Sequence, residues 1–170
     1  MSAVGNIPTN KNFLSPLNFV FTIKKTPGVN YFVQSASVPG ISTGHAQTAT
    51  PFNYMKDVGD KLTFSDLNIT FRVDEDMKNY KEIYDWIIGN SRQSFEGYAA
   101  QTRAAMGAGV KSDATLIILN SAKQPMIEVA FKDMFPVALS ELVFDTRLQD
   151  VTYIDALATF VYQSYTIKYL

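Results

Sequence analysis

Cysteine is absent from the 170-residue chain, and histidine occurs once, as His45. Without thiols the chain has no disulfide framework, thiolate metal site or thiol nucleophile, and a single histidine excludes a histidine-rich metal site. A basic excess is also missing, because 15 Lys and Arg stand against 16 Asp and Glu, a formal net charge of −1. This balance disfavours a non-specific nucleic-acid binder and a membrane-surface binder.

Long hydrophobic runs are missing as well. Residues 1–16 lack the apolar run of a signal peptide, and no 18 consecutive apolar residues predict a membrane span. Aromatic residues, in contrast, make up 13% of the chain, mostly as Phe and Tyr, which favour strands. The length suits one domain. We therefore expect a polar N-terminal arm over 1–16 and a single β-rich domain over 17–170.

Alternating apolar and polar residues predict about seven strands. Residues 18–25 and 29–38 are expected to form a hairpin around the turn at Pro27-Gly28, and residues 111–121 and 126–133 a second one. A one-residue slip in the alternation near Ser65-Asp66 predicts a β-bulge within a strand over 61–74. The remaining predicted strands are 139–146, after a break at Phe135-Pro136, and a long closing strand over 159–170.

One amphipathic helix is predicted after Asp74-Glu75-Asp76, because acidic residues suit an N-cap and a first helical turn. The residues at helical spacing that we expect to pack on the strand of Leu67, Ile69 and Phe71 are Tyr80, Ile83, Tyr84 and Ile87. Trp86 is expected at the edge of the core. The predicted fold class is mainly β: an antiparallel sandwich or barrel with a flanking α-helix and a long protruding loop or hairpin.

Two segments have weak patterns. Residues 41–60 are too long for a routine connection and predict a functional loop or a protruding hairpin. Their few apolar side chains and flanking polar ones indicate an interface that orders on contact with a partner. Residues 91–109 are rich in Gly, Ala, Ser and Gln and predict an insertion.

No motif indicates catalysis, a metal or a cofactor. The consecutive acids at 74–76 point in different directions, so they suit a helix start better than a metal site. The run Gly40–Gly44 lacks the Gly-Lys-Ser/Thr of a phosphate loop, and Ser35 and Ser37 have no histidine that the sequence nominates as a base. We expect a non-enzymatic protein; a small enzyme or ligand-binding β-barrel remains the competing class.

Several stretches, taken in order, resemble the tail tube proteins of contractile-tailed bacteriophages. They are 32–41 with its Pro-Gly stop, Pro51-Phe52, 59–70, Arg72-Val-Asp-Glu-Asp with Tyr84-Asp-Trp, 131–136, 139–145 and the closing 165–169. Residues 79–86 are also similar to the related baseplate protein that initiates the tube. A secretion-system tube subunit is a third alternative with the same fold.

The resemblance implies a β-sandwich with a flanking helix, six copies of which close into a ring. Rings would stack into a hollow tube, with sheets of neighbouring subunits joined in one barrel around the lumen. The implied partners are further copies of the chain, the sheath, tape-measure and baseplate proteins, and DNA in transit, with no membrane. The protein would be made in the host bacterial cytoplasm and reside in the virion.

Residues are assigned to these roles as expectations. The ring-stacking interface in the 41–60 segment is expected to use Ile41, His45, Phe52, Tyr54, Met55 and Val58. Because polar residues alternate along the central and closing strands, the lumen is expected to be lined by Asn68, Thr70, Arg72, Tyr162, Ser164, Thr166 and Lys168.

Overall fold

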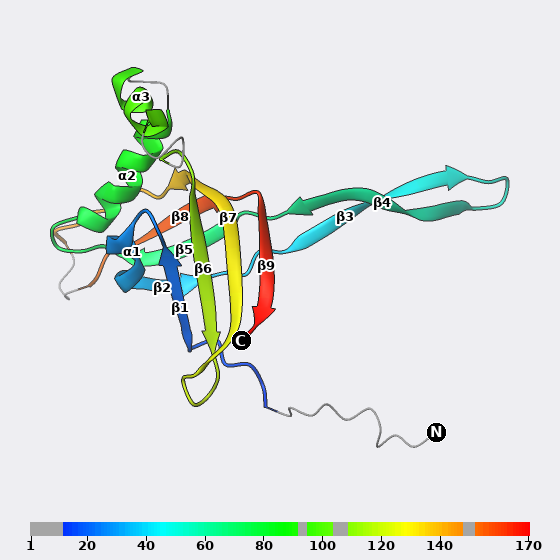
Figure 1. Cartoon of the computed structure of the whole chain (residues 1–170), viewed down its shortest axis with the longest axis horizontal. Coiled ribbons are helices and arrows are strands. Elements are labelled where there is room, and N and C mark those ends of the chain that lie inside the picture. Colours follow the sequence, from blue (N-terminus) through cyan, green and yellow to red (C-terminus); the bar gives the residue numbers. More distant parts are fainter. Residues whose placement is uncertain (1–11, 92–94, 104–108, 148–151) are drawn as a thin grey trace.

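A computed structural model describes residues 12–91, 95–103, 109–147 and 152–170 of the protein (Figure 1). Most of the predicted N-terminal arm and parts of the 91–109 segment lie outside these residues. Within them the chain forms nine strands and three helices, in the order β1 (Phe19–Ile23), α1 (Pro27–Phe32), β2 (Val33–Ala36), β3 (Ile41–Ala49), β4 (Tyr54–Phe64), β5 (Leu67–Arg72), α2 (Lys78–Asn90), α3 (Phe95–Arg103), β6 (Ser112–Leu119), β7 (Pro125–Leu139), β8 (Asp155–Val161) and β9 (Ser164–Tyr169).

Two antiparallel sheets share the long strand β7. Sheet A has the order β1-β6-β7-β9, and sheet B has the order β7-β8-β5-β2. The first part of β7 pairs with β6 and β9, and its last residues pair with β8. The strands of sheet A run across those of sheet B, while β3 and β4 leave both sheets as a separate hairpin (Figure 1). The sequence-based fold class, a β-sandwich with a protruding hairpin, is confirmed.

The core lies between the two sheets, with α2 closing one end. Buried side chains of β1, β5, β6, β7 and β8 enter it, and α2 contributes Ile83 and Trp86. The largest side chains with less than 2% exposure are Trp86, Phe71, Phe131, Phe160, Ile23, Leu67, Ile69, Ile83 and Met134. Since successive strand residues point to opposite faces, the residues between these buried ones form the outer faces of the sandwich.

The first predicted hairpin is wrong. Residues 27–32 form α1, so β1 and β2 do not pair with each other; β1 pairs with β6 and β2 with β5. Pro27 at the start of α1 has a φ suited to a first helical turn. The backbone N–H of Gly28 donates to Glu82 Oε2 of α2 (3.1 Å), so a contact distant in sequence stabilises this short helix.

The predicted bulge at Ser65-Asp66 is instead a boundary. Residues 54–64 form β4 of the hairpin and residues 67–72 form β5 of sheet B. The slip in alternation was real, but it marks the point at which the chain leaves one sheet and enters another. Residues 112–119 and 125–139 do pair, which confirms the second hairpin.

The start of α2 differs from the acidic cap that we expected. The helix begins at Lys78, after Met77 in the left-handed region (φ 55°), and Met77 itself makes no side-chain capping hydrogen bond. Asn79 is buried there; its Oδ1 accepts from the N–H groups of Asp74 (3.2 Å) and Tyr80 (2.7 Å). The side-chain amide of Asn79, inside the first turn, thus accepts backbone hydrogen bonds at the helix start, the role that we expected of the acidic residues at 74–76.

The buried stripe of α2 also differs. Ile83 is fully buried, and Tyr80 and Ile87 pack partly on the core, but Tyr84 is 51% exposed. Trp86 is buried rather than at the core edge; its ring lies near Phe160, and its Nε1 donates to Val110 O (2.9 Å). Trp86 is buried because it is covered on two sides, by the sandwich and by the chain just before β6.

The predicted closing strand is divided in two. β8 and β9 are separated at Tyr162-Gln163, and β7 continues through Phe135-Pro136 to Leu139. Pro136 is tolerated because β6 begins at Ser112, opposite Met134, so beyond this point β7 pairs only with β8 among the described strands. Residues 140–147 form no strand, contrary to prediction.

Candidate assembly interfaces

The β3–β4 hairpin projects far from the sandwich, on the side of β9 (Figure 1). At about 3.3 Å per residue, the 11 residues of β4 span roughly 35 Å. Almost every residue in it is exposed, including Ile41, His45, Tyr54 and Met55. Phe52 at the tip is 100% exposed and Val58 is 91% exposed. The structure therefore presents all six predicted interface residues on the surface of one hairpin.

Close backbone approach occurs midway along the hairpin. The register shifts between Thr43↔Leu62 and His45↔Val58, which brings Gly44 against Gly59. A Cβ added at Gly59 would lie 2.4 Å from Gly44 O, a backbone atom, whereas one at Gly44 would meet nothing within 4 Å. Glycine at 59 is thus required by this bulge, and glycine at 44 is not required by contacts.

Two tyrosines anchor the root of the hairpin. Tyr162 Oη donates to Ser65 O (2.8 Å), just after β4, and Tyr165 Oη donates to Pro39 O (3.0 Å), just before β3. Their rings pack on Phe64 and Phe131, with centroids 5.2–5.9 Å apart. Both ends of the hairpin are therefore fixed to the corner between β8 and β9.

Tyr162 is consequently not a lumen residue, contrary to prediction. The inward alternation of β8 continues through Phe160 to Tyr162, and the chain bends before β9 begins. Burial, with smaller contributions from Tyr165 and Asp66, raises the pKa of Tyr162 to about 12. The phenol therefore stays neutral and keeps its hydrogen bond at any physiological pH.

The other predicted lumen residues fall into two groups that point away from each other. In β9, Tyr165 and Ile167 lie opposite Phe131 and Val129 of β7, whose buried side chains mark the core-facing side of the sheet. The residues that alternate with them, Ser164, Thr166 and Lys168, are therefore on the outer face of sheet A. Asn68, Thr70 and Arg72 are on the outer face of sheet B, since Leu67, Ile69 and Phe71 point inward. A core separates the two groups, so one channel cannot be lined by both.

Arg72 is also engaged within its own subunit. Its Nε donates to Asp155 Oδ1 (3.1 Å), and its guanidinium lies 4.4 Å from the centroid of the Tyr153 ring. Asn68 is similarly bound, because its Oδ1 accepts from the Thr159 hydroxyl (2.9 Å). These contacts hold the two side chains flat on sheet B.

Within the part of the chain that the structure describes, sheet A has two free edges, β1 and β9. In β1 the residues at even positions bond to β6, as seen at Asn18 O and Lys24 N–H, so the odd residues turn their backbone groups outward. In β9 the even residues bond to β7, as seen at Leu170 N–H, so Tyr165, Ile167 and Tyr169 turn theirs outward. Unpaired edges of this kind bind another strand unless something covers them.

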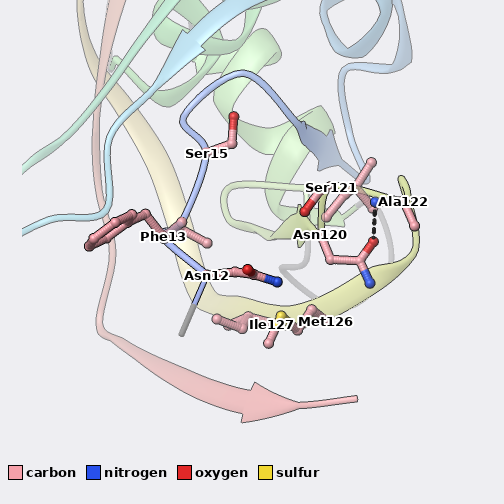
Figure 2. A pocket seen from close by; sticks show the side chains of 10 residues that line it. Asn12, Phe13, Ser15, Asn120, Ser121, Ala122, Met126 and Ile127 are labelled. Atoms are coloured by element: carbon pink, nitrogen blue, oxygen red, sulfur yellow. Dashed lines mark hydrogen bonds between the residues drawn. The ribbon is translucent and has the colours of Figure 1, made fainter. Parts of the chain in front are cut away.

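An apolar hollow of about 630 Å³ lies beside the β6–β7 turn, at one end of sheet A (Figure 2). Its wall includes Phe13 from the N-terminal segment and Met126 and Ile127 from β7. At its rim the Ala122 N–H donates to Asn120 Oδ1 (2.9 Å), which fixes the β6–β7 turn. This end of the sheet adjoins the exposed end of β9.

Titratable groups form surface ion pairs rather than a reactive cluster. The Lys24 ammonium bonds to Asp113 (2.9 Å) and holds the pKa of that carboxyl below its usual value. Burial lowers the pKa of Lys25, whose Nζ lies 4.7 Å from the Trp86 ring centroid. Among the described residues there is no group of three His, Asp or Glu side chains that would hold a metal ion.

A family model described as phage tail tube protein matches residues 7–168. This match covers nearly the whole chain, including both sheets and the hairpin. The chain belongs to the phage tail tube protein family. It is thus a structural tail component of the kind that the sequence resemblance indicated. Separately, no helix within the described residues is long and apolar enough to cross a membrane.

Three individual proteins that the chain resembles are terminator or cap proteins. The chain is 27% identical over 139 residues to the tail tube terminator protein of Enterobacteria phage T4, covering 78% of this chain and 76% of that protein. It shares the fold of the tube-terminating cap of the anti-feeding prophage, with a TM-score of 0.66, 18% identity and complete coverage of both chains. A sheath/tube terminator of the PVC extracellular contractile injection system gives a TM-score of 0.65 at 18% identity, covering 94% of this chain and 99% of that one.

Sequence reasoning missed the tyrosine anchor of the hairpin. Tyr162 and Tyr165 stand three residues apart, a spacing that is neither alternate nor adjacent in a strand. The available signal is that these two aromatic residues fall on opposite faces of one predicted strand. Both can be buried only if the chain bends between them.

Proposed function

We propose that the protein is a ring-forming subunit of the phage tail tube, six copies of which close a ring that stacks on others. The observation that carries this proposal is the pair of free edges on sheet A. β1 and β9 have similar lengths, of five and six residues, and lie at opposite sides of the same four strands. An isolated chain would leave both edges unpaired in water, which invites association.

Strand directions favour closure by rotation. The four strands of sheet A alternate in direction, so β9 runs antiparallel to β1 (Figure 1). Rotation about an axis along the strands preserves these directions, and β9 of one copy then meets β1 of the next as an antiparallel pair. Repetition gives one closed barrel without free edges.

In such a ring, the outer face of sheet A faces the lumen. That face carries Thr22, Lys132, Thr166 and Lys168, with Glu128 opposite Lys168 in the register. Mixed charge and hydroxyl groups suit a wet channel that does not retain phosphates, as passage of DNA and packing of the tape-measure protein require. The outer face of sheet B, with Asn68 and Arg72, would then face outward, towards the sheath.

The hairpin is proposed to contact an adjacent subunit or ring. It leaves the molecule on the side of the β9 edge, so the neighbour that joins this edge is within its reach (Figure 1). Two isolated strands are marginal in water, and the exposed Phe52, Tyr54, Met55 and Val58 would gain burial against a partner. Hydrogen exchange should show residues 43–57 unprotected in the monomer and protected in assembled tubes; equal protection would exclude this role.

A terminator ring is the second candidate. It is supported by the match to the T4 tail tube terminator, which spans most of both chains. A tube subunit and a terminator differ in how far they stack: the first propagates, and the second ends a tube. A baseplate initiator and a secretion-system tube subunit remain alternatives with the same fold.

Electron microscopy of the purified protein tests the proposal. Tubes of many rings would support a tube subunit, and isolated rings that cap pre-formed tubes would support a terminator. A protein that stays monomeric at all concentrations, by analytical ultracentrifugation and microscopy, would contradict both. Counting copies per virion by quantitative mass spectrometry separates one or two rings from many.

A further inference from the structure

Asn30 covers one residue of the free edge of β1. Its Oδ1 accepts a hydrogen bond from the Ile23 N–H (2.7 Å), and its Nδ2 donates to the Ile23 carbonyl (3.1 Å). These are the two backbone groups of Ile23 that point away from β6, so the amide occupies the place of a neighbouring strand. The free edge therefore stops before Ile23. It comprises Phe19 and Phe21, together with the Leu17 carbonyl, the Leu17 N–H being bonded to Ser15 Oγ (3.4 Å).

The opposite edge has a matching limit. β9 begins at Ser164, directly after the bend at Tyr162-Gln163, and its outward backbone groups belong to Tyr165, Ile167 and Tyr169. Each edge is thus bounded at one end: β1 by the amide of Asn30 and β9 by the anchored corner. An antiparallel pair brings these two bounded ends together.

We propose that β9 of one copy pairs with β1 of the next in a single register, set by Asn30, with Tyr165 opposite Phe21, Ile167 opposite Phe19 and Tyr169 opposite Leu17. The inference rests on the proposed ring-forming function and specifies its junction. Ser164, the first residue of β9, then falls opposite Thr22, the last residue before the covered Ile23. All six residues of β9 find a partner, and none meets Asn30.

Exposure along the two edges supports this register. Leu17 is 85% exposed and Tyr169 is 82% exposed, and the register places them side by side. Ile167 is 52% exposed and faces the half-buried Phe19, while the half-buried Tyr165 faces the buried Phe21. The side chains that most need covering are therefore paired with each other on the core side of the sheet.

Registers shifted by one or two residues are less favourable than the proposed one. Slipping β9 by two residues towards Ile23 sets Tyr165 opposite Ile23, where Asn30 already fills the space. Slipping it by two the other way draws Gln163 of the bend into the pair and leaves Tyr169 beyond Leu17. A slip of one residue turns Ile167 and Tyr169 to the lumen face.

Cysteine pairs test the register directly, because the chain has no cysteine of its own. Val20 and Thr166 are exposed on the outer face of sheet A, and the register makes them a directly opposite pair without mutual hydrogen bonds, with Cα atoms about 4.5 Å apart. Within one chain β6 and β7 separate them, a distance of roughly 14 Å, so an intrachain disulfide is excluded. The double variant Val20→Cys/Thr166→Cys should therefore give covalent ladders up to closed rings on a non-reducing gel.

Matched controls use the slipped partners. Val20→Cys/Lys168→Cys and Val20→Cys/Ser164→Cys place the second thiol two residues away on the same face, too far to bond in the proposed register. We expect both to remain at the background of the single variants. Adding Asn30→Ala should allow the slip towards Ile23 and make the Val20→Cys/Lys168→Cys pair crosslink; a thermal melt checks that this variant still folds.

The outcomes separate the two proposals. If the unmodified protein never forms rings by microscopy, the proposed function fails, and the junction fails with it. If rings form but a slipped pair crosslinks, or no pair does, the register is wrong while the ring stands. If Asn30→Ala folds and leaves the crosslinking pattern unchanged, Asn30 does not set the register.

Discussion

The sandwich and the hairpin are built from the same antiparallel pairing but differ in burial. In β5 and β8 every second side chain has negligible exposure, whereas all nine residues of β3 are exposed. Two paired strands without a second layer gain little from burial, and a packed sandwich gains most of its stability from it. The sandwich thus maintains the fold of the monomer, and the hairpin is available for contacts between monomers.

The largest expected effect is the loss of stability when a core side chain of α2 is truncated, compared with truncation of its exposed neighbour. Ile83→Ala removes a fully buried side chain of α2 and should lower the unfolding free energy by about 2–5 kcal/mol. Tyr84→Ala, one residue along the helix, removes an exposed side chain and should change it by less than about 0.5 kcal/mol. Chemical denaturation measures both, and equal effects would contradict the assigned face of α2.

The next effect should appear in the hairpin without reaching the sandwich. Gly59→Ala forces a Cβ against the Gly44 carbonyl, which should cost about 1–3 kcal/mol locally. Because the hairpin lies outside the core, we expect the melting of the sandwich to be retained while ring or tube assembly is lost.

The matched control for this variant is the partner glycine. Gly44→Ala meets no atom within 4 Å, so it should leave both the sandwich and assembly intact. If Gly44→Ala and Gly59→Ala assembled equally well, the bulge would have no role in positioning the hairpin. Circular dichroism and microscopy on the same samples provide the two readouts.

Sequence reasoning succeeded where a pattern has one cause. Alternation in Leu67, Ile69 and Phe71 gave a buried strand because one face of it is covered along its whole length. It failed where partners distant in sequence decide the structure, as at α1, which Glu82 stabilises from another helix. Local turn residues at Pro27-Gly28 suit a hairpin and a helix start equally well.

The assignment of site residues failed for a related reason. Polar alternation identifies an outward face, but a sandwich has two outward faces, and the sequence does not say which strand belongs to which sheet. Thr70 and Thr166 have the same pattern and lie on opposite sides of the core. Free edges are equally invisible in the sequence, since they depend on the order of strands in the sheet.

A smaller effect should appear at the root that joins the two regions. Tyr162→Phe removes the hydrogen bond to Ser65 O and should cost about 0.5–1.5 kcal/mol. Because the folded-state pKa of about 12 lies above the ordinary value of 10, the native protein should lose stability as pH rises from 10 towards 12. Tyr162→Phe should lack this alkaline component; an unchanged stability profile would show that Tyr162 is not buried.

The smallest effect is expected on the outer face of sheet A, where the predicted lumen set can be divided by experiment. Lys168→Ser and Thr166→Ser alter exposed side chains of β9 whose backbone bonds to β7 persist, so each should change the unfolding free energy by less than about 0.5 kcal/mol. Both should also assemble, because the junction uses the odd residues of β9. Tyr162→Ser, drawn from the same predicted set, should instead destabilise the protein strongly, since it empties a site packed among Phe64, Phe131 and Tyr165. If the three serine variants behaved alike in denaturation, the bend between β8 and β9 would not divide this set, and the outward face of the closing strand would extend through Tyr162.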